Sequence, residues 1–125
     1  MSDAKPPVGT IGWLDLTVDD APRVREFYSE VVGWTPHAVP MGEYEDWAMG
    51  PPEGKPVAGV CHRRGGNADQ PLAWVPYIIV ENLEASLEAV ERLGGEVAVP
   101  ARTMGESSFA VIRDPAGAIC ALYQP

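Results

Sequence analysis

Residues 11–33 read Ile-Gly-Trp-Leu-Asp-Leu-Thr-Val-Asp-Asp-Ala-Pro-Arg-Val-Arg-Glu-Phe-Tyr-Ser-Glu-Val-Val-Gly, and this stretch decides the fold. In its first part, residues 11–18, the aliphatic side chains of Leu14, Leu16 and Val18 alternate with those of Trp13, Asp15 and Thr17. This period of two predicts a strand. Asp19 or Asp20 then caps a helix with Pro22 in its first turn, and Gly33 ends that helix. Apolar residues share one face of the helix, namely Val24, Phe27, Tyr28, Val31 and Val32.

The same order of elements occurs twice. After the first helix, short strands are predicted over residues 34–40, 44–49 and 56–62. In the second half a strand at 75–80 precedes a helix that Asn82 caps and Gly94-Gly95 ends. Three further strands are predicted over residues 96–100, 108–113 and 118–123.

The two halves also match in register. Pairs at a spacing of 62 are Val18 and Val80, Asp20 and Asn82, Gly33 and Gly95, and the run 47–49 with the run 109–111. Gly54 matches Gly117 at a spacing of 63, and Met41-Gly42-Glu43 matches Met104-Gly105-Glu106 at the same spacing. This periodicity indicates an internal duplication of a strand-helix-strand-strand-strand unit.

We therefore predict an α+β fold made of two βαβββ modules in tandem. A single domain would cover residues 8–124, with module one at 8–63, module two at 73–124 and a linker at 64–72. One module is too small to bury both its helix and its sheet. The helices are therefore expected outside, with the two sheets facing each other around a cleft.

Composition excludes several classes of function. The chain has 125 residues and a net charge of −9, with 9 basic residues against 18 acidic ones, so it lacks the basic footprint of a nucleic-acid-binding protein. No apolar run approaches the roughly 20 residues that span a bilayer, and residues 1–7 do not resemble a secretory signal. Cys61 and Cys120 are too few for a disulfide framework, so we expect buried reduced thiols in a cytoplasmic protein.

Three stretches together resemble the vicinal oxygen chelate superfamily, which includes glyoxalase I, extradiol dioxygenases and the bleomycin- and fosfomycin-resistance proteins. They are Leu-Asp-Leu-Thr-Val-Asp-Asp at 14–20, Phe-Tyr-Ser-Glu-Val-Val-Gly-Trp at 27–34, and Arg-Asp-Pro-Ala-Gly at 113–117. The resemblance covers about residues 8–124. It implies paired βαβββ modules curled around a cavity, and it also implies a homodimer.

The resemblance implies a divalent metal held by residues on the first and last strands of a module. The matching positions carry Trp13, Val75, Ala58 and Ala121, none of which can coordinate a cation through its side chain. We therefore predict no metal and no other cofactor. A metal site built from other residues remains the alternative, with His62, Asp15, His37 and the two cysteines as candidate ligands.

Strand alternation sorts the side chains between the helix side and the cleft side. The residues expected to face the cleft and contact a ligand are Trp13, Asp15, Trp47, Val60, His62, Tyr77, Ala121 and Tyr123. The third strand of module two has two alternatives. A four-residue loop after it would turn Ala110 and Ile112 to the cleft, whereas a five-residue loop would turn Phe109 there. The face assigned to Trp47 depends in the same way on how its strand pairs with the next one.

The predicted function is that of a glyoxalase/bleomycin-resistance-like protein. It would bind a small organic molecule, aromatic or cationic, in an apolar cleft without the usual metal. The alternative is an enzyme related to lactoylglutathione lyase (a lyase, isomerase or dioxygenase) that uses a metal or an acid–base pair of Asp15 and His62. A third interpretation is an interaction module whose cleft is filled by its own side chains.

Overall fold

The computed structural model describes residues 6–125. It contains eight strands, two α-helices and a short 3-10 helix, in the order expected of two βαβββ repeats. The described chain forms two compact units. The first contains Trp13–Trp74, and the second contains Val75–Pro125 together with residues 6–12. The α+β class and the tandem repeat are thereby confirmed, and the single domain with its module boundaries stays a prediction.

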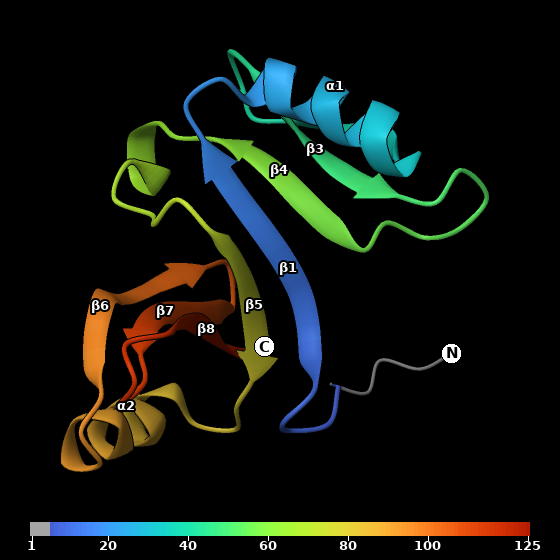
Figure 1. Cartoon of the computed structure of the whole chain (residues 1–125). Coiled ribbons are helices and arrows are strands. Elements are labelled where there is room, and N and C mark those ends of the chain that lie inside the picture. The colour runs from blue at the N-terminus through green and yellow to red at the C-terminus, as the bar shows by residue number, and fades with distance from the viewer. Residues whose placement is uncertain (1–5) are drawn as a thin grey trace. The chain divides into compact units, whose positions relative to one another are not determined.

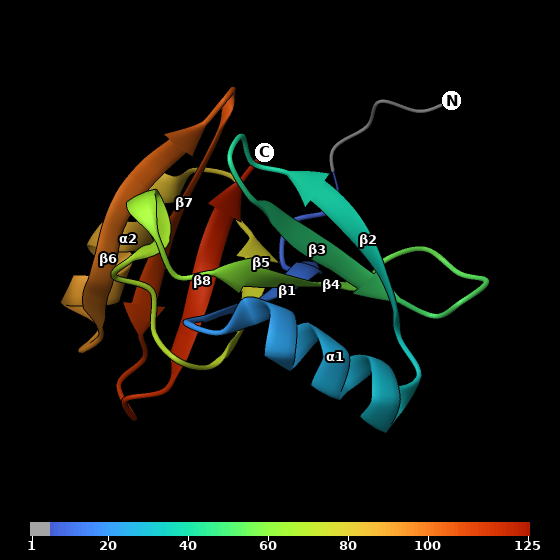
Figure 2. The ribbon, with the colours of Figure 1, turned by 90° about the horizontal axis from the view of Figure 1, so that it is seen from above.

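The first unit is a four-stranded sheet with one helix along one face (Figures 1 and 2). The strands occur in the order β2-β3-β4-β1; β1 and β4 run parallel, and the other neighbours run antiparallel. Its elements are β1 (Ile11–Val18), α1 (Ala21–Val32), β2 (Thr35–Pro40), β3 (Glu45–Gly50) and β4 (Ala58–His62), followed by the 3-10 helix Gly65–Asn67.

Helix α1 begins and ends as the sequence predicts. The Asp20 carboxylate accepts a hydrogen bond from the Arg23 backbone N–H at 3.4 Å, so Asp20 and not Asp19 is the cap. Pro22 lies in the first turn, and Gly33 ends the helix with a φ of 79°, a left-handed conformation that glycine adopts without strain. Asp19 instead forms an ion pair with Arg63 at 3.3 Å.

The second unit repeats this arrangement. Its strands occur in the order β5-β8-β7-β6, and β5 and β8 run parallel. The Asn82 side chain caps α2 by accepting from the Ala85 N–H at 2.9 Å. The elements are β5 (Trp74–Ile79), α2 (Leu83–Arg92), β6 (Glu96–Met104), β7 (Ser107–Arg113) and β8 (Ile119–Gln124).

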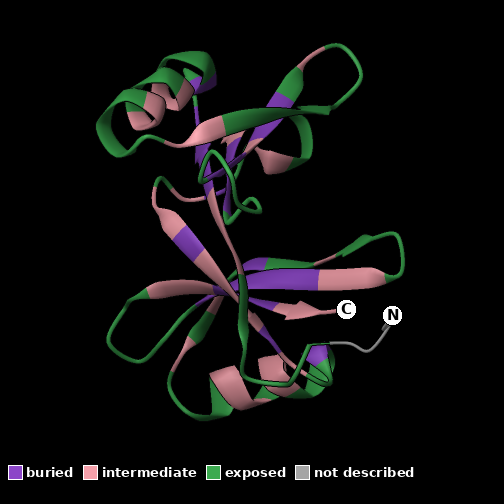
Figure 3. Ribbon diagram, turned by 90° about the vertical axis from the view of Figure 1, so that its right-hand side faces the viewer, coloured by how far each residue is buried: buried purple, intermediate pink, exposed green. Residues whose placement is uncertain are grey.

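Each unit has a core between its own helix and one face of its own sheet. In the second unit, residues on the opposite face are buried as well, among them Ile79, Phe109, Val111 and Ala121. Figure 3 shows that buried residues gather on the strands, whereas the outer faces of the helices are exposed. The core under α1 contains Leu16, Val18, Ala21, Trp47, Met49 and Val60. The core under α2 contains Leu83, Ala110, Ile112 and Leu122, with Ile78 and Leu87 packed against it.

The length of the loop between β7 and β8 decides which side chains of β7, the third strand of the second module, face the helix. Five residues, 114–118, join the two strands. Phe109 therefore pairs with Tyr123, and Ala110 pairs with Leu122 in the core under α2. The five-residue alternative is confirmed, and Phe109 lies on the sheet face opposite the helix.

The corresponding connection in the first unit, residues 51–57, is longer, and equivalent paired residues on its two strands are one position further apart along the chain. Trp47 pairs with Val60, as Ala110 pairs with Leu122. Val60 precedes Leu122 by 62 residues, but Trp47 precedes Ala110 by 63. The spacing is therefore 63 on β3 and 62 on β4, the reverse of the alignment expected from the sequence. Because side chains alternate with period two, this shift reverses the faces assigned to both strands.

Residues just before β1 belong with the second unit. The Gly9 N–H donates to the Ile79 carbonyl, and the Ile79 N–H donates to the Thr10 carbonyl, both at 2.8 Å. Within residues 6–125, neither helix has the length and apolar character needed to cross a membrane.

Candidate functional site

We call the sheet face opposite the helix of each unit its helix-free face. In the first unit, Leu16 and Val18 on β1 pack under α1. Their neighbours Trp13, Asp15 and Thr17 therefore lie on the helix-free face, because side chains alternate along a strand. This placement agrees with the sequence-based prediction for β1.

One row of residues crosses the helix-free face of the first unit. Asp15 on β1 is opposite Gly59 on β4, Gly59 is opposite Ala48 on β3, and Ala48 is opposite His37 on β2. The row therefore places a carboxylate at one end and an imidazole at the other, with two small residues between them. At three strand spacings, the backbones of Asp15 and His37 are about 14 Å apart.

The Asp15 carboxylate lies beside the indole of Trp13. The Trp13 Nε1–H donates to Asp15 Oδ1 at 2.7 Å. Burial raises the pKa of Asp15 above its usual range; the Trp13 hydrogen bond opposes this rise, and the nearby charge of Asp46 adds to it. Asp15 is thus a half-buried acid with one oxygen already engaged.

Cys61 lies on the same face, opposite Thr17. Burial raises the pKa of its thiol far above the ordinary range, and the charges of Asp15 and Asp46 raise it further. Thiolates, and not thiols, are the reactive form of cysteine. Burial and the neighbouring carboxylates therefore disfavour the thiolate form of Cys61.

The structure corrects the predicted faces of three candidate site residues. Val60 was expected to face the cleft, but it is fully buried in the core under α1. Trp47 belongs to the same core, where the Arg25 guanidinium lies 4.6 Å from the centroid of its ring system. His62 is opposite Val18, so it also lies on the helix side of the sheet. Ala58, two residues before Val60, lies on the helix side as well. The physical reason is the longer β3–β4 connection described above.

His62 has a different carboxylate partner from the one expected. Asp46 Oδ1 accepts from the His62 backbone N–H at 2.9 Å and lies 3.1 Å from His62 Nδ1. The imidazole also contacts the rings of Tyr44 and Trp47, with centroids at 5.1 Å and 5.5 Å. The expected acid–base pair of Asp15 and His62 is therefore wrong, because the two residues lie on opposite faces and bond different partners.

The second unit presents aromatic residues on its helix-free face. Tyr77 is opposite Ala121 and Phe109 is opposite Tyr123, as predicted for Tyr77, Ala121 and Tyr123. The rings of Tyr77 and Phe109 have centroids 5.8 Å apart. The Tyr123 hydroxyl donates to Ser107 Oγ at 3.0 Å. This face is more apolar than that of the first unit.

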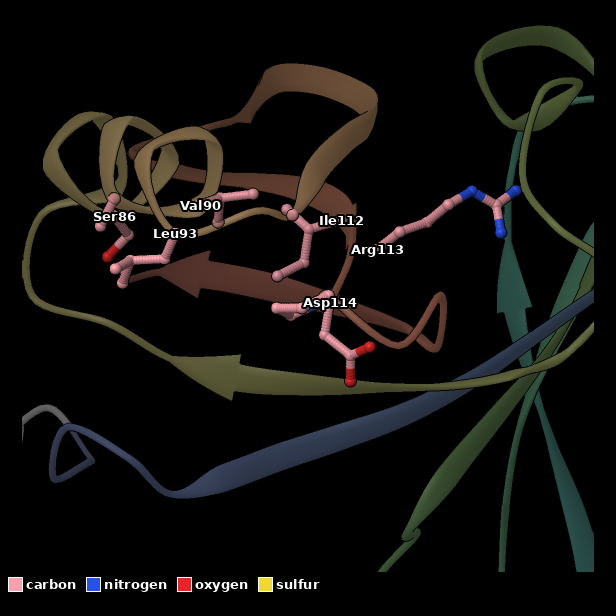
Figure 4. A pocket seen from close by; sticks show the side chains of 9 residues that line it. Ser86, Val90, Leu93, Ile112, Arg113 and Asp114 are labelled. Atoms are coloured by element: carbon pink, nitrogen blue, oxygen red, sulfur yellow. The ribbon is translucent and has the colours of Figure 1, made fainter.

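A separate groove of about 350 Å³ lies between α2 and the β7–β8 turn (Figure 4). Asp114 Oδ1 accepts from the Ala116 and Ala118 N–H groups, and Arg113 extends away from the groove in Figure 4. The groove was not predicted from the sequence, and it lies on the helix side of the sheet. Its lining is Ser86, Ala89, Val90, Leu93, Gly95, Ile112, Arg113, Asp114 and Pro115.

The side chains do not fit the divalent metal that the resemblance implies. Among residues 6–125, no group of three or more His, Cys, Asp or Glu side chains could hold a metal ion. The paired positions on first and last strands hold Asp15 with Gly59, and Tyr77 with Ala121. Each pair offers at most one oxygen-bearing side chain, whereas protein metal sites use three or more ligands.

Two residues of this site were not anticipated from the sequence. Asp46 is 5% exposed, and its carboxylate organises the end of β4. Gly59 leaves the space into which the Asp15 carboxylate fits. Both roles depend on the β3–β4 register, and the only hint in the sequence is a glycine inside a strand pattern.

Comparisons with known proteins agree with this fold. The chain belongs to the Glyoxalase/Bleomycin resistance protein/Dioxygenase superfamily, whose family model matches residues 10–121. It is 31% identical over 119 residues to "Putative glyoxylase CFP32" of Mycobacterium tuberculosis, covering 93% of this chain and 46% of that protein. It is also 31% identical over 132 residues to "Anthracycline biosynthesis protein DnrV" of Streptomyces peucetius, covering 93% and 47%. The chain thus spans about half the length of these relatives.

Solved structures with low sequence identity share the fold. Methylmalonyl-CoA epimerase from Mycobacterium tuberculosis is similar with a TM-score of 0.55 and 16% identity, over 98% of this chain and 93% of the epimerase. A V278E mutant of glyoxalase I from Zea mays is similar with a TM-score of 0.58 and 16% identity, over 94% of this chain and 43% of that enzyme. The family model over residues 10–121 confirms the resemblance to the vicinal oxygen chelate superfamily, and these structures agree with its fold.

Proposed function

We propose that the protein binds a small organic molecule, aromatic or cationic, on the helix-free faces of its units, and that it does so without a bound metal. The observation that carries this proposal is the pair of Trp13 and Asp15, a half-buried indole and a half-buried carboxylate on one face. Ligand sites commonly combine aromatic walls with a few polar groups that fix orientation. Tyr77, Ala121 and Tyr123 lie on the helix-free face of the second unit, where the two tyrosines offer a separate aromatic surface and Ala121 itself is fully buried.

The names of two relatives support an aromatic ligand. Both are designated as anthracycline biosynthesis proteins, and they match this chain at 31% and 30% identity. Anthracyclines are flat polycyclic molecules, and a flat ring system stacks well on indole and phenol side chains. The negative charge of the chain favours ligands that carry a positive charge.

Binding in the presence of a chelator tests the proposal. Two probes share one ring system: 1-naphthylmethylammonium and 1-naphthalenemethanol. We expect at least one of them to bind in excess EDTA, and Trp13→Phe to weaken binding about threefold to tenfold. Trp74→Phe is the matched control, because Trp74 packs with Tyr28 on the helix side of the first unit. Absence of binding by both probes at millimolar concentration would overturn the proposal.

An enzyme related to lactoylglutathione lyase is the second candidate. Membership of the superfamily supports it, and so does the raised pKa of Asp15, because a perturbed carboxyl in a site is suited to proton transfer. Asp15 would then act alone or with a metal whose remaining ligands come from another chain. Elemental analysis of protein purified without a metal-affinity tag distinguishes the two functions. Near-stoichiometric zinc, nickel, iron or manganese would favour the enzyme.

We also propose that the chain forms a homodimer in the cytoplasm. Its curated relatives are about twice as long, so a second copy would supply a comparable number of modules. Helix α1 exposes Phe27, Val31 and Val32, which a partner could cover. Light scattering coupled to size-exclusion chromatography would give twice the monomer mass for a dimer.

A further inference from the structure

The Asp15 carboxylate lacks a positively charged partner. It is half-buried, yet no Lys, Arg or His among residues 6–125 forms an ion pair with it. Its side-chain hydrogen bond comes from the neutral indole of Trp13, which engages Oδ1. Carboxylates removed from water are usually paired with a cation, because desolvation of an unpaired charge is costly. The Asp15 carboxylate is therefore suited to bind a cation.

Gly59 determines where this carboxylate lies. A Cβ atom at position 59 would overlap Asp15 Oδ1, and it would lie 3.3 Å from Trp13 Nε1 and 3.4 Å from Asp15 Cγ. The backbone of Gly59 does not have a positive φ, so its conformation does not require glycine. The requirement is space: Asp15 Oδ1 occupies the position that a side chain at residue 59 would take, and the Trp13 indole N–H donates to it there.

The surroundings of Asp15 are acidic as well as aromatic. The carboxylate of Asp46 is near enough to repel a negative charge on Asp15, and the whole chain carries a net charge of −9. A second negative charge makes the site unfavourable for anions. A bound cation would relieve this repulsion and could also lie against the π-face of Trp13.

We propose that Asp15 recognises a positively charged nitrogen on a flat organic ligand, and that Trp13 and Gly59 are the residues that position its carboxylate. The ligand class is a small aromatic molecule bearing a protonated amine or amidinium group. Oδ1 is held by the indole, so Oδ2 accepts the ligand N–H. This inference rests on the proposed function, since it names the class of molecule that the helix-free face of the first unit takes.

The two naphthalene probes separate charge from shape. Isothermal titration at neutral pH, with EDTA present, gives the affinity of 1-naphthylmethylammonium relative to neutral 1-naphthalenemethanol. We expect the wild-type protein to prefer the ammonium probe about tenfold or more, as a charge-assisted hydrogen bond allows. Asp15→Asn should abolish this preference while leaving the affinity for the neutral probe within about twofold.

Gly59→Ala tests the positioning role. The added methyl should displace the Asp15 carboxylate, reduce the preference for the ammonium probe, and shift the ¹H–¹⁵N resonance of the Trp13 indole. Gly66→Ala is the matched control, because a Cβ at position 66 meets no atom within 4 Å. It should keep both the preference and the indole resonance. Circular dichroism establishes whether each variant folds, and Asp15→Asn tests the inference if Gly59→Ala does not.

The outcomes distinguish this inference from the proposed function. If both probes bind with equal affinity and Asp15→Asn changes neither, recognition of a cation is overturned while binding of a small molecule stands. If neither probe binds at millimolar concentration, both the recognition of a cation and the proposed binding function are overturned. If Gly59→Ala folds and keeps the full preference for the ammonium probe, the positioning role of Gly59 is overturned.

Discussion

Substitution of Gly59 by alanine should destabilise the fold through the side chain of Asp15. In a strand interior, alanine is ordinarily more favourable than glycine by roughly 0.5–1 kcal/mol. Here the new methyl would overlap Asp15 Oδ1 and crowd Trp13 Nε1. Overpacking of this kind costs about 1–3 kcal/mol, and loss of the indole–carboxylate hydrogen bond adds about 1.5–3 kcal/mol. We therefore expect Gly59→Ala to lower the free energy of unfolding by about 2 kcal/mol or more.

The same structure predicts that a second substitution rescues the first. In an Asp15→Ala background the overlapping oxygen is gone, and Trp13 Nε1 at 3.3 Å is the remaining close atom. Gly59→Ala should then be neutral within about 0.5 kcal/mol, or stabilising, because its intrinsic strand preference is no longer opposed. The double-mutant cycle should give a coupling energy of about 2 kcal/mol between positions 15 and 59.

Urea denaturation followed by circular dichroism measures all four proteins of this cycle. The midpoints should shift with an unchanged m-value if the substitutions act on the folded state. Additive effects, with Gly59→Ala equally destabilising in both backgrounds, would refute the claim that the Asp15 carboxylate lies across Gly59. Gly66→Ala again serves as the control, and it should show no dependence on Asp15.

Three further substitutions test the charge on Asp15, the hydrogen bond of Asp46 and the core under α1. Asp15→Asn should raise the free energy of unfolding at pH 7, because burial raises the pKa of Asp15 in the folded state and makes its negative charge unfavourable there. This stabilisation should shrink as the pH falls from above the raised pKa to the ordinary value of 3.8, and a stabilisation seen only at low pH would contradict the prediction. Asp46→Ala should lower the free energy of unfolding by about 2–3 kcal/mol, since it leaves the backbone N–H of His62 without its acceptor; a urea midpoint equal to that of the wild type would contradict this role. Met49→Ala should cost about 2–5 kcal/mol, because Met49 is fully buried under α1, and an effect below 1 kcal/mol in the same assay would contradict the core assignment.

Much of the fold follows from local signals in the sequence. Asp20 and Asn82 cap the helices because their side-chain oxygens accept backbone N–H groups of the first turn, and the apolar residues at helical spacing that follow them make these caps recognisable in the sequence. Gly33 supplies the left-handed turn that ends α1. In the second unit, alternation placed Tyr77 and Tyr123 on the correct face. These features depend on neighbours in sequence, so sequence alone could predict them.

The first unit shows where such reasoning fails. The alignment of the repeats matched Trp47 with Phe109 because both are aromatic, but Trp47 is the structural counterpart of Ala110. A single additional residue before β4 then moved Val60 to the helix side. A loop length cannot be derived from residue type when prolines and glycines permit several turns, and one residue reverses every face that follows.

The candidate site was predictable only in part. Trp13 and Asp15 follow from alternation along β1, but their hydrogen bond and the space at Gly59 do not. The partnership of Asp46 with His62 also depends on which strands are neighbours. Burial and pairing across strands are properties of the register, and the sequence does not encode that register locally.

The four tryptophans report on ligand binding at separate places in the chain. Titration of 1-naphthylmethylammonium into ¹⁵N-labelled protein, with EDTA present, follows their indole N–H resonances. Trp13 is on the helix-free face of the first unit, whereas Trp34, Trp47 and Trp74 belong to the packing on its helix side. We predict a saturable shift of the Trp13 resonance, with the other three unchanged. A shift confined to the other tryptophans, or no shift at millimolar probe, would contradict binding at the helix-free face.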